Sequence, residues 1–292
     1  MFYSPLRYPG GKSKIAPLIR FLLQEQGLIG GTYIEPFAGG AGVALDLLLT
    51  GSVERIVIND YDKGVYSFWR AILTETNRFV DLVRSIPLTI EEWHNQKEIV
   101  QQKSDKYSFE LGFATFYLNR TNRSGIIKGG IIGGIHQTGE WKMDARFNRE
   151  NLVERIVRIA ERRDSIKVYN KDICSFLERY VPKYENNAFI YFDPPYYDKG
   201  KQLYLNYFSY DDHLRIEETI RNKVNCSWII TYDNVPEIVR LYDGCVMRQF
   251  DLNYSAAHVC KASEIIIFGP NIAAPSKRQL NNSHVYVDIR KL

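Results

Sequence analysis

The sequence predicts an α/β protein in which helices cover both faces of a sheet, with a mainly helical domain inserted into it. Short Val-, Ile- and aromatic-rich runs recur along the chain and, from Val57 onward, alternate with helical periodicity. That strand pattern disappears over residues 63–165, where apolar residues recur at helical spacing instead. We therefore expect a sheet domain formed by residues 1–62 and 166–292, and an inserted domain formed by residues 63–165.

The first strand is expected around Ile34, and it runs into a glycine-rich turn followed by the helical run Val43–Leu49. In the first unit of a doubly wound sheet, such glycines let the backbone come close to a ligand that carries a nucleoside. A plain tight turn is the alternative. Since no Gly-x-Gly-x-x-Gly pattern is present, an adenosine carrying an amino acid fits better than one carrying phosphates. The turn reads Glu35-Pro36-Phe37-Ala38-Gly39-Gly40-Ala41-Gly42.

Acidic residues follow the next two expected strands. The strand around Val57 ends at Asn59-Asp60, about 20 residues after the first glycines, which is the spacing at which a carboxylate reaches ribose hydroxyls. The strand around Val168 is followed by Asp172. Two interpretations of Asp172 stay open: it accepts from the adenine amino group of a cofactor, or it caps the following helix.

The inserted segment is expected to be helical over residues 65–83, 90–103, 107–119 and 148–163, with a glycine-rich loop over residues 124–139. Two arginines and two asparagines cluster where the third helix enters that loop. Arginine suits guanine edges and phosphates, and asparagine suits adenine, so a nucleic-acid surface is favoured over a solvated polar loop. The expected contacts are Asn119, Arg120, Asn122, Arg123 and Lys128, and the positive character extends to Lys142, Arg146 and Arg149.

The most informative stretch is Asp193-Pro194-Pro195-Tyr196, which follows the apolar run Ala188–Phe192. It predicts a buried strand that stops abruptly, at prolines that leave neighbouring carbonyls as spare acceptors. Carboxylate, carbonyl and aromatic ring together suit a planar amino group: Asp193 and the Pro194 carbonyl each accept one N–H, and Tyr196 stacks on the ring. A strand followed by a simple proline turn is the alternative.

Near the start of the chain, Gly11-Lys12-Ser13 imitates part of a phosphate-binding loop. The full pattern needs a glycine where Leu6 stands and a strand before it, so we reject a nucleoside triphosphatase. Tyr8 and Lys12 are instead expected to border the cofactor pocket, with a solvated basic loop as the alternative. At the other end we expect strands around Ile229 and Ile266, a loop over residues 273–282 and a final strand over residues 285–289.

Composition narrows the class of protein. The 292 residues are 45% hydrophobic and 25% charged, which suits a folded enzyme, and the net charge of +4 permits a nucleic-acid partner. No apolar run approaches the roughly 20 residues that span a bilayer, and no signal-peptide core is visible, so we expect a cytoplasmic protein without a membrane partner. The four cysteines and five histidines lack metal-ligand spacing, which predicts reduced thiols and no metal.

Taken in order, these segments resemble the Dam-like, D12-class DNA adenine-N6 methyltransferases over nearly the whole chain. Further matching pieces are Tyr117-Leu118-Asn119-Arg120, Gly139-Glu140-Trp141 and Lys261-Ala262-Ser263-Glu264. The resemblance implies a Rossmann-like methyltransferase sheet, residues 63–165 as target-recognition domain, S-adenosylmethionine as methyl donor and adenine in duplex DNA as acceptor. Asp193 is then expected beside both cofactor and base. Because Thr121–Ser124 departs from the tyrosine-rich segment of better-known members, no recognition sequence is carried over.

The mechanism expected from this resemblance relies on orientation. The target amine is a poor nucleophile inside a stacked duplex, so its base is flipped out at a cost of a few kcal/mol and held in line with the methyl group. Within the enzyme class, an N4-cytosine methyltransferase is the nearest alternative, although it more often has Ser in place of Asp193. A protein- or RNA-directed amine methylase and a non-catalytic DNA-binding protein are further alternatives. A cognate restriction endonuclease is a candidate partner, and the oligomeric state is left open.

Overall fold

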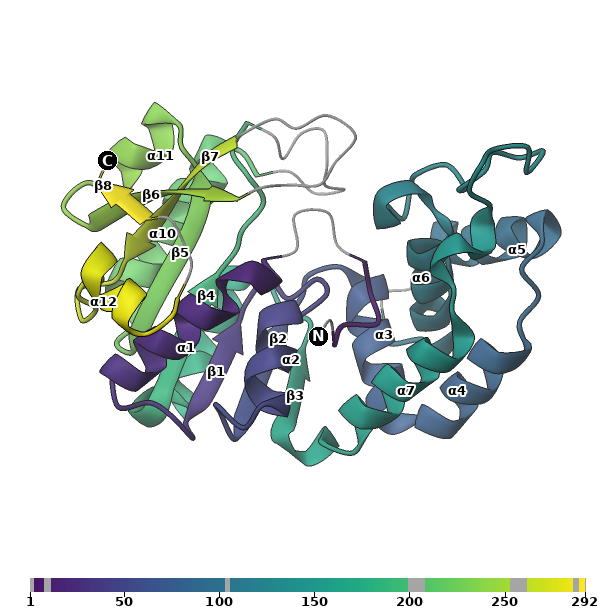
Figure 1. The fold of residues 1–292 in the computed structure, drawn as a ribbon, viewed down its shortest axis with the longest axis horizontal. Coiled ribbons are helices and arrows are strands. Elements are labelled where there is room, and N and C mark those ends of the chain that lie inside the picture. The colour runs from purple at the N-terminus through teal and green to yellow at the C-terminus, as the bar shows by residue number, and fades with distance from the viewer. Residues whose placement is uncertain are drawn as a thin grey trace. The chain divides into compact units, whose positions relative to one another are not determined.

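The computed structural model describes residues 3–7, 12–102, 106–198, 208–252, 262–285 and 289–291, and these form two compact units (Figure 1). The helical unit comprises residues 1–11, 38–45 and 58–170. The sheet unit comprises residues 12–37, 46–57 and 171–292. Each unit is therefore assembled from three separate segments of the chain.

The sheet unit is built on a mixed sheet whose central strands are buried in the core. Strands β1 and β4 have no exposed residue, as expected of central strands covered on both faces. β1 pairs in parallel with β4, and β4 with β5, whereas β7 runs antiparallel to both β5 and β6. In the described residues the order is β1 (Thr32–Glu35), β4 (Ala188–Phe192), β5 (Ser227–Asp233), β7 (Ala262–Phe268), β6 (Val246–Leu252) and β8 (Ile289–Lys291); β2 (Arg55–Asn59) and β3 (Ile166–Tyr169) complete an eight-stranded sheet.

The direction of each strand decides which residues meet at the sheet edge. Parallel strands end at the same edge, so the residues that follow β4 and β5 lie together there. Because β7 runs the opposite way, its first residues lie at that same edge: Glu264 pairs with Asp233, the last residue of β5. The helices of this unit are α1 (Ala16–Glu25), α8 (Ile173–Arg179), α10 (Tyr210–Lys223), α11 (Pro236–Leu241) and α12 (Lys277–Asn282), while α2 (Gly42–Leu49) belongs partly to each unit.

The helical unit packs around a cluster of phenylalanine rings. Phe68 stacks on Phe116 with ring centroids 5.8 Å apart, and Phe79 contacts both rings edge-on. Two helices cross closely at Gly112, where only a glycine fits: a Cβ at that position would lie 2.6 Å from the backbone of Ser67. The helices are α3 (Lys63–Thr74), α4 (Thr76–Ser85), α5 (Ile90–Gln101), α6 (Phe109–Thr121) and α7 (Arg149–Ala160).

Most of the expected elements are confirmed. Strands occur at Ile34, Val57, Val168, Ile190, Ile229 and Ile266, and the described part of residues 63–165 contains helices and one isolated β-bridge.

Three expectations need correction. The run over residues 65–83 is two helices, because the chain leaves helical geometry at Glu75. Residues 273–282 are not simply a loop: Ser276 and Gln279 form a capping box that starts α12. The final strand is Ile289–Lys291 instead of residues 285–289, of which residues 286–288 lie outside the described part.

Candidate active site

Asp193 follows directly on β4, and a chain of hydroxyl groups fixes its orientation. The Thr231 hydroxyl, on neighbouring β5, donates to Asp193 Oδ1 at 3.0 Å. Since that hydroxyl has only one proton, the contact of 2.9 Å between Tyr191 and Thr231 has Tyr191 as donor. One carboxylate oxygen is therefore held by groups that two adjacent strands supply.

A second carboxylate and an ammonium group complete the cluster. Lys12 Nζ lies 3.3 Å from Asp193 Oδ1 and 2.9 Å from Glu264 Oε2. The Tyr196 hydroxyl donates to Glu264 Oε1 and also contacts Lys12 Nζ. The side chains of Lys12 and Glu264 are 2% and 1% exposed, whereas that of Asp193 is 26% exposed. Asp193 is thus the member of this cluster that is open to a ligand. We call Lys12, Asp193, Tyr196 and Glu264 the carboxylate cluster.

The charges of the carboxylate cluster act on Asp193 in opposite directions. Burial raises the pKa of Asp193, Lys12 lowers it, Glu264 raises it and the hydrogen bond from Thr231 lowers it, with burial the largest effect. The balance is a raised pKa. Burial raises the pKa of Tyr191 and Tyr33 well above the ordinary value, so both phenols stay neutral beside the carboxylates.

The loop that follows Tyr196 is fixed by the end of β5. Asp233 accepts hydrogen bonds from the backbone N–H groups of Tyr197, at 3.0 Å, and Asp198, at 2.9 Å. Sequence analysis did not select Asp233, Thr231 or Tyr191. Their only sequence signal is their place at or near the carboxyl ends of two adjacent parallel strands, where side chains converge.

In the helical unit, Asp60 and the glycine-rich turn are joined directly. Gly39 N–H donates to Asp60 Oδ2 at 2.8 Å, and Asp62 N–H donates to Oδ1 at 2.9 Å. The turn needs left-handed backbone, with φ of 44° at Gly39 and 46° at Ala41. The Trp69 indole N–H caps the turn by donating to the Gly39 carbonyl at 2.9 Å. Burial, with the nearby charge of Asp62, raises the pKa of Asp60 to about 7.

The other predicted cofactor residues have different surroundings. Asp172 caps α8 by accepting from the N–H groups of Cys174 and Ser175, which confirms the capping interpretation, and it lies 3.3 Å from Arg215. Glu35 and Pro36 are buried, and Phe37 packs on Phe208 with ring centroids 6.1 Å apart. Tyr8 lies outside the described residues, as does Lys261. The predicted ligand contact of Asp172, Glu35, Pro36, Phe37 and Tyr8 stays a prediction.

The two predicted asparagines are buried and hold together the glycine-rich loop over residues 124–139, which we call the recognition loop after its expected role. Asn119 accepts from Arg7 N–H at 2.6 Å and donates to the Arg7 and Gly125 carbonyls. Asn122 accepts from the Trp93 indole at 2.7 Å and donates to two loop carbonyls. Gly125 has φ of +76°, and a Cβ there would lie 2.4 Å from the Arg7 carbonyl. These amides give the loop its shape, while Arg123 and Lys128 are exposed on it.

Arg120 belongs to a cluster of arginines whose recorded acceptors are backbone carbonyls. It donates to the Arg146 carbonyl at 2.7 Å, and Arg155 donates to the Ser4 carbonyl at 2.9 Å. Burial and the charges of Arg7, Arg155 and Arg146 lower the pKa of Arg120 to about 9. Among the described residues, no carboxylate forms an ion pair with Arg7, Arg120, Arg146 or Arg155. A surplus of positive charge therefore collects beside the recognition loop.

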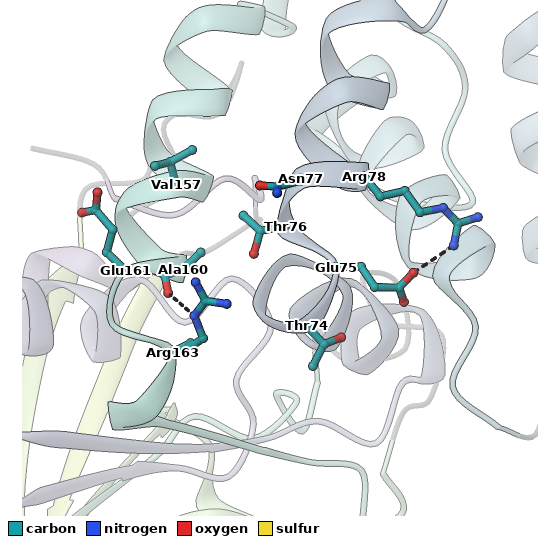
Figure 2. A pocket seen from close by; sticks show the side chains of 9 residues that line it. All are labelled: Thr74, Glu75, Thr76, Asn77, Arg78, Val157, Ala160, Glu161 and Arg163. Atoms are coloured by element: carbon teal, nitrogen blue, oxygen red, sulfur yellow. Dashed lines mark hydrogen bonds and ion pairs between the residues drawn. The ribbon is translucent and has the colours of Figure 1, made fainter.

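A cavity of about 390 Å³ also lies in the helical unit, but none of the predicted site residues lines it. Figure 2 shows its two arginines already engaged: Arg78 pairs with Glu75 at 2.9 Å, and Arg163 donates to the Ala160 carbonyl at 3.1 Å. Both arginines that line the cavity therefore already have partners. We assign it no function.

Neither a metal centre nor a membrane span emerges from the described residues. In that part of the chain no three His, Cys, Asp or Glu side chains are grouped closely enough to hold an ion. Likewise, no described helix is both long and apolar enough to cross a bilayer.

Comparison with known proteins identifies the family of this chain. The family described as D12 class N6 adenine-specific DNA methyltransferase matches residues 8–256. Type II methyltransferase M.MjaIII of Methanocaldococcus jannaschii is 24% identical over 82% of this chain and 87% of its own length. Type II methyltransferase M1.LlaDCHI of Lactococcus lactis subsp. cremoris is 24% identical over 74% of this chain and 75% of its own. The rRNA methyltransferase aviRa from Streptomyces viridochromogenes, a solved structure, has a TM-score of 0.36 and 10% identity over 86% of this chain and 84% of its own.

An α/β sheet with an acidic cluster after β4 and a glycine-rich turn after β1 is the architecture of a methyltransferase. Because the family match spans most of the sequence, the chain belongs to the D12 class N6 adenine-specific DNA methyltransferases. It is a site-specific DNA methyltransferase, as the fold and the order of its motifs led us to expect.

Proposed function

We propose that this enzyme transfers a methyl group from S-adenosylmethionine to N6 of an adenine that has been flipped out of duplex DNA. The observation that supports this most directly is the asymmetry of Asp193. Its Oδ1 is fixed by Thr231 and Lys12, whereas in the described part of the structure no group hydrogen-bonds to Oδ2. A partly exposed carboxylate with one oxygen fixed and one open is suited to accept an N–H from a ligand.

The chemical step then depends on orientation. The adenine amine is conjugated with its ring, so its nitrogen lone pair must be turned toward the methyl group before it can attack. Asp193 Oδ2 accepts one N6 hydrogen and the Pro194 carbonyl accepts the other, while Pro195 and Tyr196 shape the pocket around the ring. The bond from methyl carbon to sulfur breaks as the bond to N6 forms, and the released N6 proton leaves through the hydrogen bond to Asp193. Such positioning can lower the barrier by several kcal/mol.

The methyl donor supplies an electrophilic methyl group on a sulfonium. We propose that its nucleoside binds at Asp60 and at the turn Ala38-Gly39-Gly40-Ala41-Gly42. The Asp60 carboxylate uses one lone pair on each oxygen for the backbone and keeps others for ribose hydroxyls. The glycines let a nucleoside approach the backbone. Beside these we keep Tyr8, Lys12, Glu35, Pro36, Phe37, Asp172 and Asp193 as proposed cofactor contacts.

For DNA, we propose that the recognition loop and the arginines beside it form the interface, within a target-recognition domain of residues 63–165. Arg123 and Lys128 are exposed cations, and Trp141, at 65% exposure, adds a large aromatic surface just after the loop. Arg7, Arg120, Arg146 and Arg155 lack carboxylate partners among the described residues, so DNA phosphates suit them as counter-ions. Asn119 and Asn122 act on DNA through the loop shape that they maintain.

A product assay tests this proposal. The purified enzyme is incubated with S-adenosylmethionine labelled in its methyl group and with genomic DNA, and the DNA is then digested to nucleosides. We expect the label in N6-methyladenine. Label in N4-methylcytosine would favour the nearest alternative, and no transfer to DNA despite cofactor binding would favour a non-catalytic DNA-binding protein.

We further propose that the enzyme works in the cytoplasm, because its substrate is chromosomal or invading DNA. A cognate restriction endonuclease is a candidate partner. Cleavage of unmethylated DNA by an endonuclease at the sites that this enzyme methylates is the observation that tests that partnership.

A further inference from the structure

The carboxylate cluster contains more negative than positive charge. Asp193 and Glu264 share the single ammonium of Lys12, at 3.3 and 2.9 Å. Glu264 is 1% exposed at its side chain, and its position at the start of β7 is fixed on both sides by pairing with Asp233 and Phe250. A glutamate buried this deeply is expensive to keep ionised unless its oxygens have partners. Here Oε2 has Lys12, and Oε1 receives the Tyr196 hydroxyl.

Resting on the proposed function of Asp193 as acceptor of the target amine, we propose that Glu264 is a positioning residue for methyl transfer. It holds the Tyr196 ring and the Lys12 ammonium in place, and its negative charge limits how strongly Lys12 acts on Asp193. Glu264 reaches the reaction only through these two neighbours.

The geometry explains the first part of this role. Tyr196 is 7% exposed, and its hydroxyl contacts Glu264 and Lys12, while Lys12 Nζ also lies 4.7 Å from the centre of the Tyr196 ring. Ring and ammonium are therefore tied to one carboxylate on a strand. A change in the length of the Glu264 side chain must move Tyr196, Lys12 or both.

The charges explain the second part. The charges that act most strongly on the pKa of Asp193 are those of Lys12, from the segment before α1, and Glu264, from β7. The Thr231 hydroxyl on β5 and the phenols of Tyr191 on β4 and Tyr33 on β1 are neutral. Two further carboxylates end the neighbouring strands: Glu35 on β1, whose charge also raises the pKa of both phenols, and Asp233 on β5, which accepts from the Tyr197 and Asp198 N–H groups. If Glu264 loses its charge, Lys12 is left with Asp193 as its only carboxylate in the cluster. The carboxylate of Asp193 then becomes easier to ionise, and the pKa of Asp193 falls.

Two substitutions separate geometry from charge. Glu264→Gln keeps the length of the side chain and removes the charge, whereas Glu264→Asp keeps the charge and shortens the reach by one methylene. For each variant we would measure the methyl-transfer rate in a single turnover on DNA from pH 5 to 9, and cofactor affinity by calorimetry. Glu178→Gln, at an exposed position on α8, is the matched control.

We expect both Glu264 variants to slow transfer by about 10- to 100-fold, the size of effect that a small misplacement produces, with a smaller loss of cofactor affinity because Lys12 is also a proposed cofactor contact. The acid limb of the pH profile should move to lower pH in Glu264→Gln and stay in place in Glu264→Asp. A wild-type rate and profile in Glu264→Gln would overturn the proposal. So would equal losses with identical pH profiles in both variants, because these would indicate structural support alone.

A second measurement keeps the test decisive if Glu264→Gln does not fold. Tyr196→Phe removes the hydroxyl that Glu264 holds, so its effect on the rate should not add to that of Glu264→Asp. Additive losses would contradict the positioning role.

Failure of the proposed function can be told apart from failure of this inference. If the wild type transfers no methyl group to DNA, the proposed function fails. The pKa of Asp193, followed by carbon-13 NMR of enzyme labelled at aspartate carboxyls and assigned with Asp193→Asn, is then still expected to fall in Glu264→Gln. An unchanged or higher pKa would overturn the inference.

Discussion

Thr231 and Asp193 lie at the ends of neighbouring strands, and the hydroxyl of the first donates to Oδ1 of the second at 3.0 Å. The orientation of the carboxylate that we assign to the target amine is therefore set by the strand beside it. Replacing that hydroxyl tests whether this support matters for the reaction.

Thr231→Val has nearly the same shape but cannot donate. We expect the methyl-transfer rate to fall roughly 10- to 100-fold, since a hydrogen bond to a charged group is worth about 1.5–3 kcal/mol. The pKa of Asp193 should rise, because the bond from Thr231 lowers it, and the acid limb of the rate profile should move to higher pH. Single-turnover rates measure both effects. Thr74→Val, at an exposed helical position, is the control; equal rates in wild type and Thr231→Val would show that this contact is unimportant.

Asp193→Ala should abolish transfer, while cofactor binding falls much less. The carboxylate is assigned to the target amine, so its loss appears in the chemical step. Single-turnover transfer and calorimetry give the two quantities. Asp198→Asn, at an exposed position in the same loop, is the matched control and should behave as wild type. Near-normal turnover in Asp193→Ala would remove Asp193 from its assigned role.

Cofactor binding should depend on pH through Asp60. The folded protein has a raised pKa of about 7 at this carboxylate, so Asp60 takes up a proton as the pH falls through that value. The protonated form is a weaker acceptor for ribose hydroxyls, and we expect affinity for S-adenosylmethionine to decrease from pH 8.5 to pH 6. Calorimetry at several pH values measures this directly.

Asp60→Asn should bind more weakly at pH 8.5 and lose most of that pH dependence, while Asp81→Asn, exposed on α4, should match wild type. Protonation of Asp60 has the opposite effect on the stability of the fold: it weakens cofactor binding but stabilises the folded protein. Because the pKa is raised on folding, the free energy of unfolding gains from Asp60 as the pH falls toward 4 and loses that gain as the pH rises through about 7. Cofactor affinity that is constant with pH in the wild type would contradict the assignment.

Arg123→Ala should weaken or broaden DNA binding without changing cofactor affinity. An arginine on a base edge would cost about 1–3 kcal/mol at one position of the site, whereas one on a phosphate would weaken all sequences equally. Fluorescence anisotropy on a set of single-base variants distinguishes these patterns, with Arg162→Ala, at an exposed position shortly after α7, as control. Affinity should fall steeply with salt. Unaltered binding and target choice would remove this loop from the interface.

Gly112→Ala should destabilise the protein, since its Cβ would lie 2.6 Å from the Ser67 backbone where α3 and α6 cross. Backbone atoms cannot turn aside as a flexible side chain can, and overpacking of this kind costs about 1–3 kcal/mol. Denaturant unfolding measures the loss. Gly130→Ala meets no atom within 4 Å and should have little effect; equal stabilities of the two variants would show that the helices can separate at low cost.

Sequence patterns predicted local structure well because hydrophobic period and turn chemistry are local. The all-apolar run before Asp193 became a buried central strand, and the glycines after Ile34 became the turn that Asp60 holds. Strand β6 was missed because Val246–Leu252 mixes polar and apolar residues in a run that is not strongly apolar. Helix α12 was missed because its signal is a capping box in a polar segment.

The partners inside the site were harder to predict, because they join residues that are distant along the chain. Nothing local connects Lys12 with Glu264, which are 252 residues apart, or Thr231 with Asp193. The asparagines of the recognition loop show the reverse problem: their residue type suits adenine, but burial directs Asn119 and Asn122 to backbone groups of the loop itself. Residue type predicted which hydrogen bonds a side chain could form, and packing decided which partners it formed them with.

The reversed direction of β7 has a consequence for the order in which the site is assembled. A ribosome that has made the chain as far as Asp193 has already produced Lys12, and the two can pair before Glu264 exists. The acidic group that restrains Lys12 is added only after β5 and β6 have been synthesised. An unfinished chain that ends before residue 264 would therefore contain Lys12 and Asp193 but lack the second carboxylate, and only the longer chain could acquire the final charge balance of the carboxylate cluster.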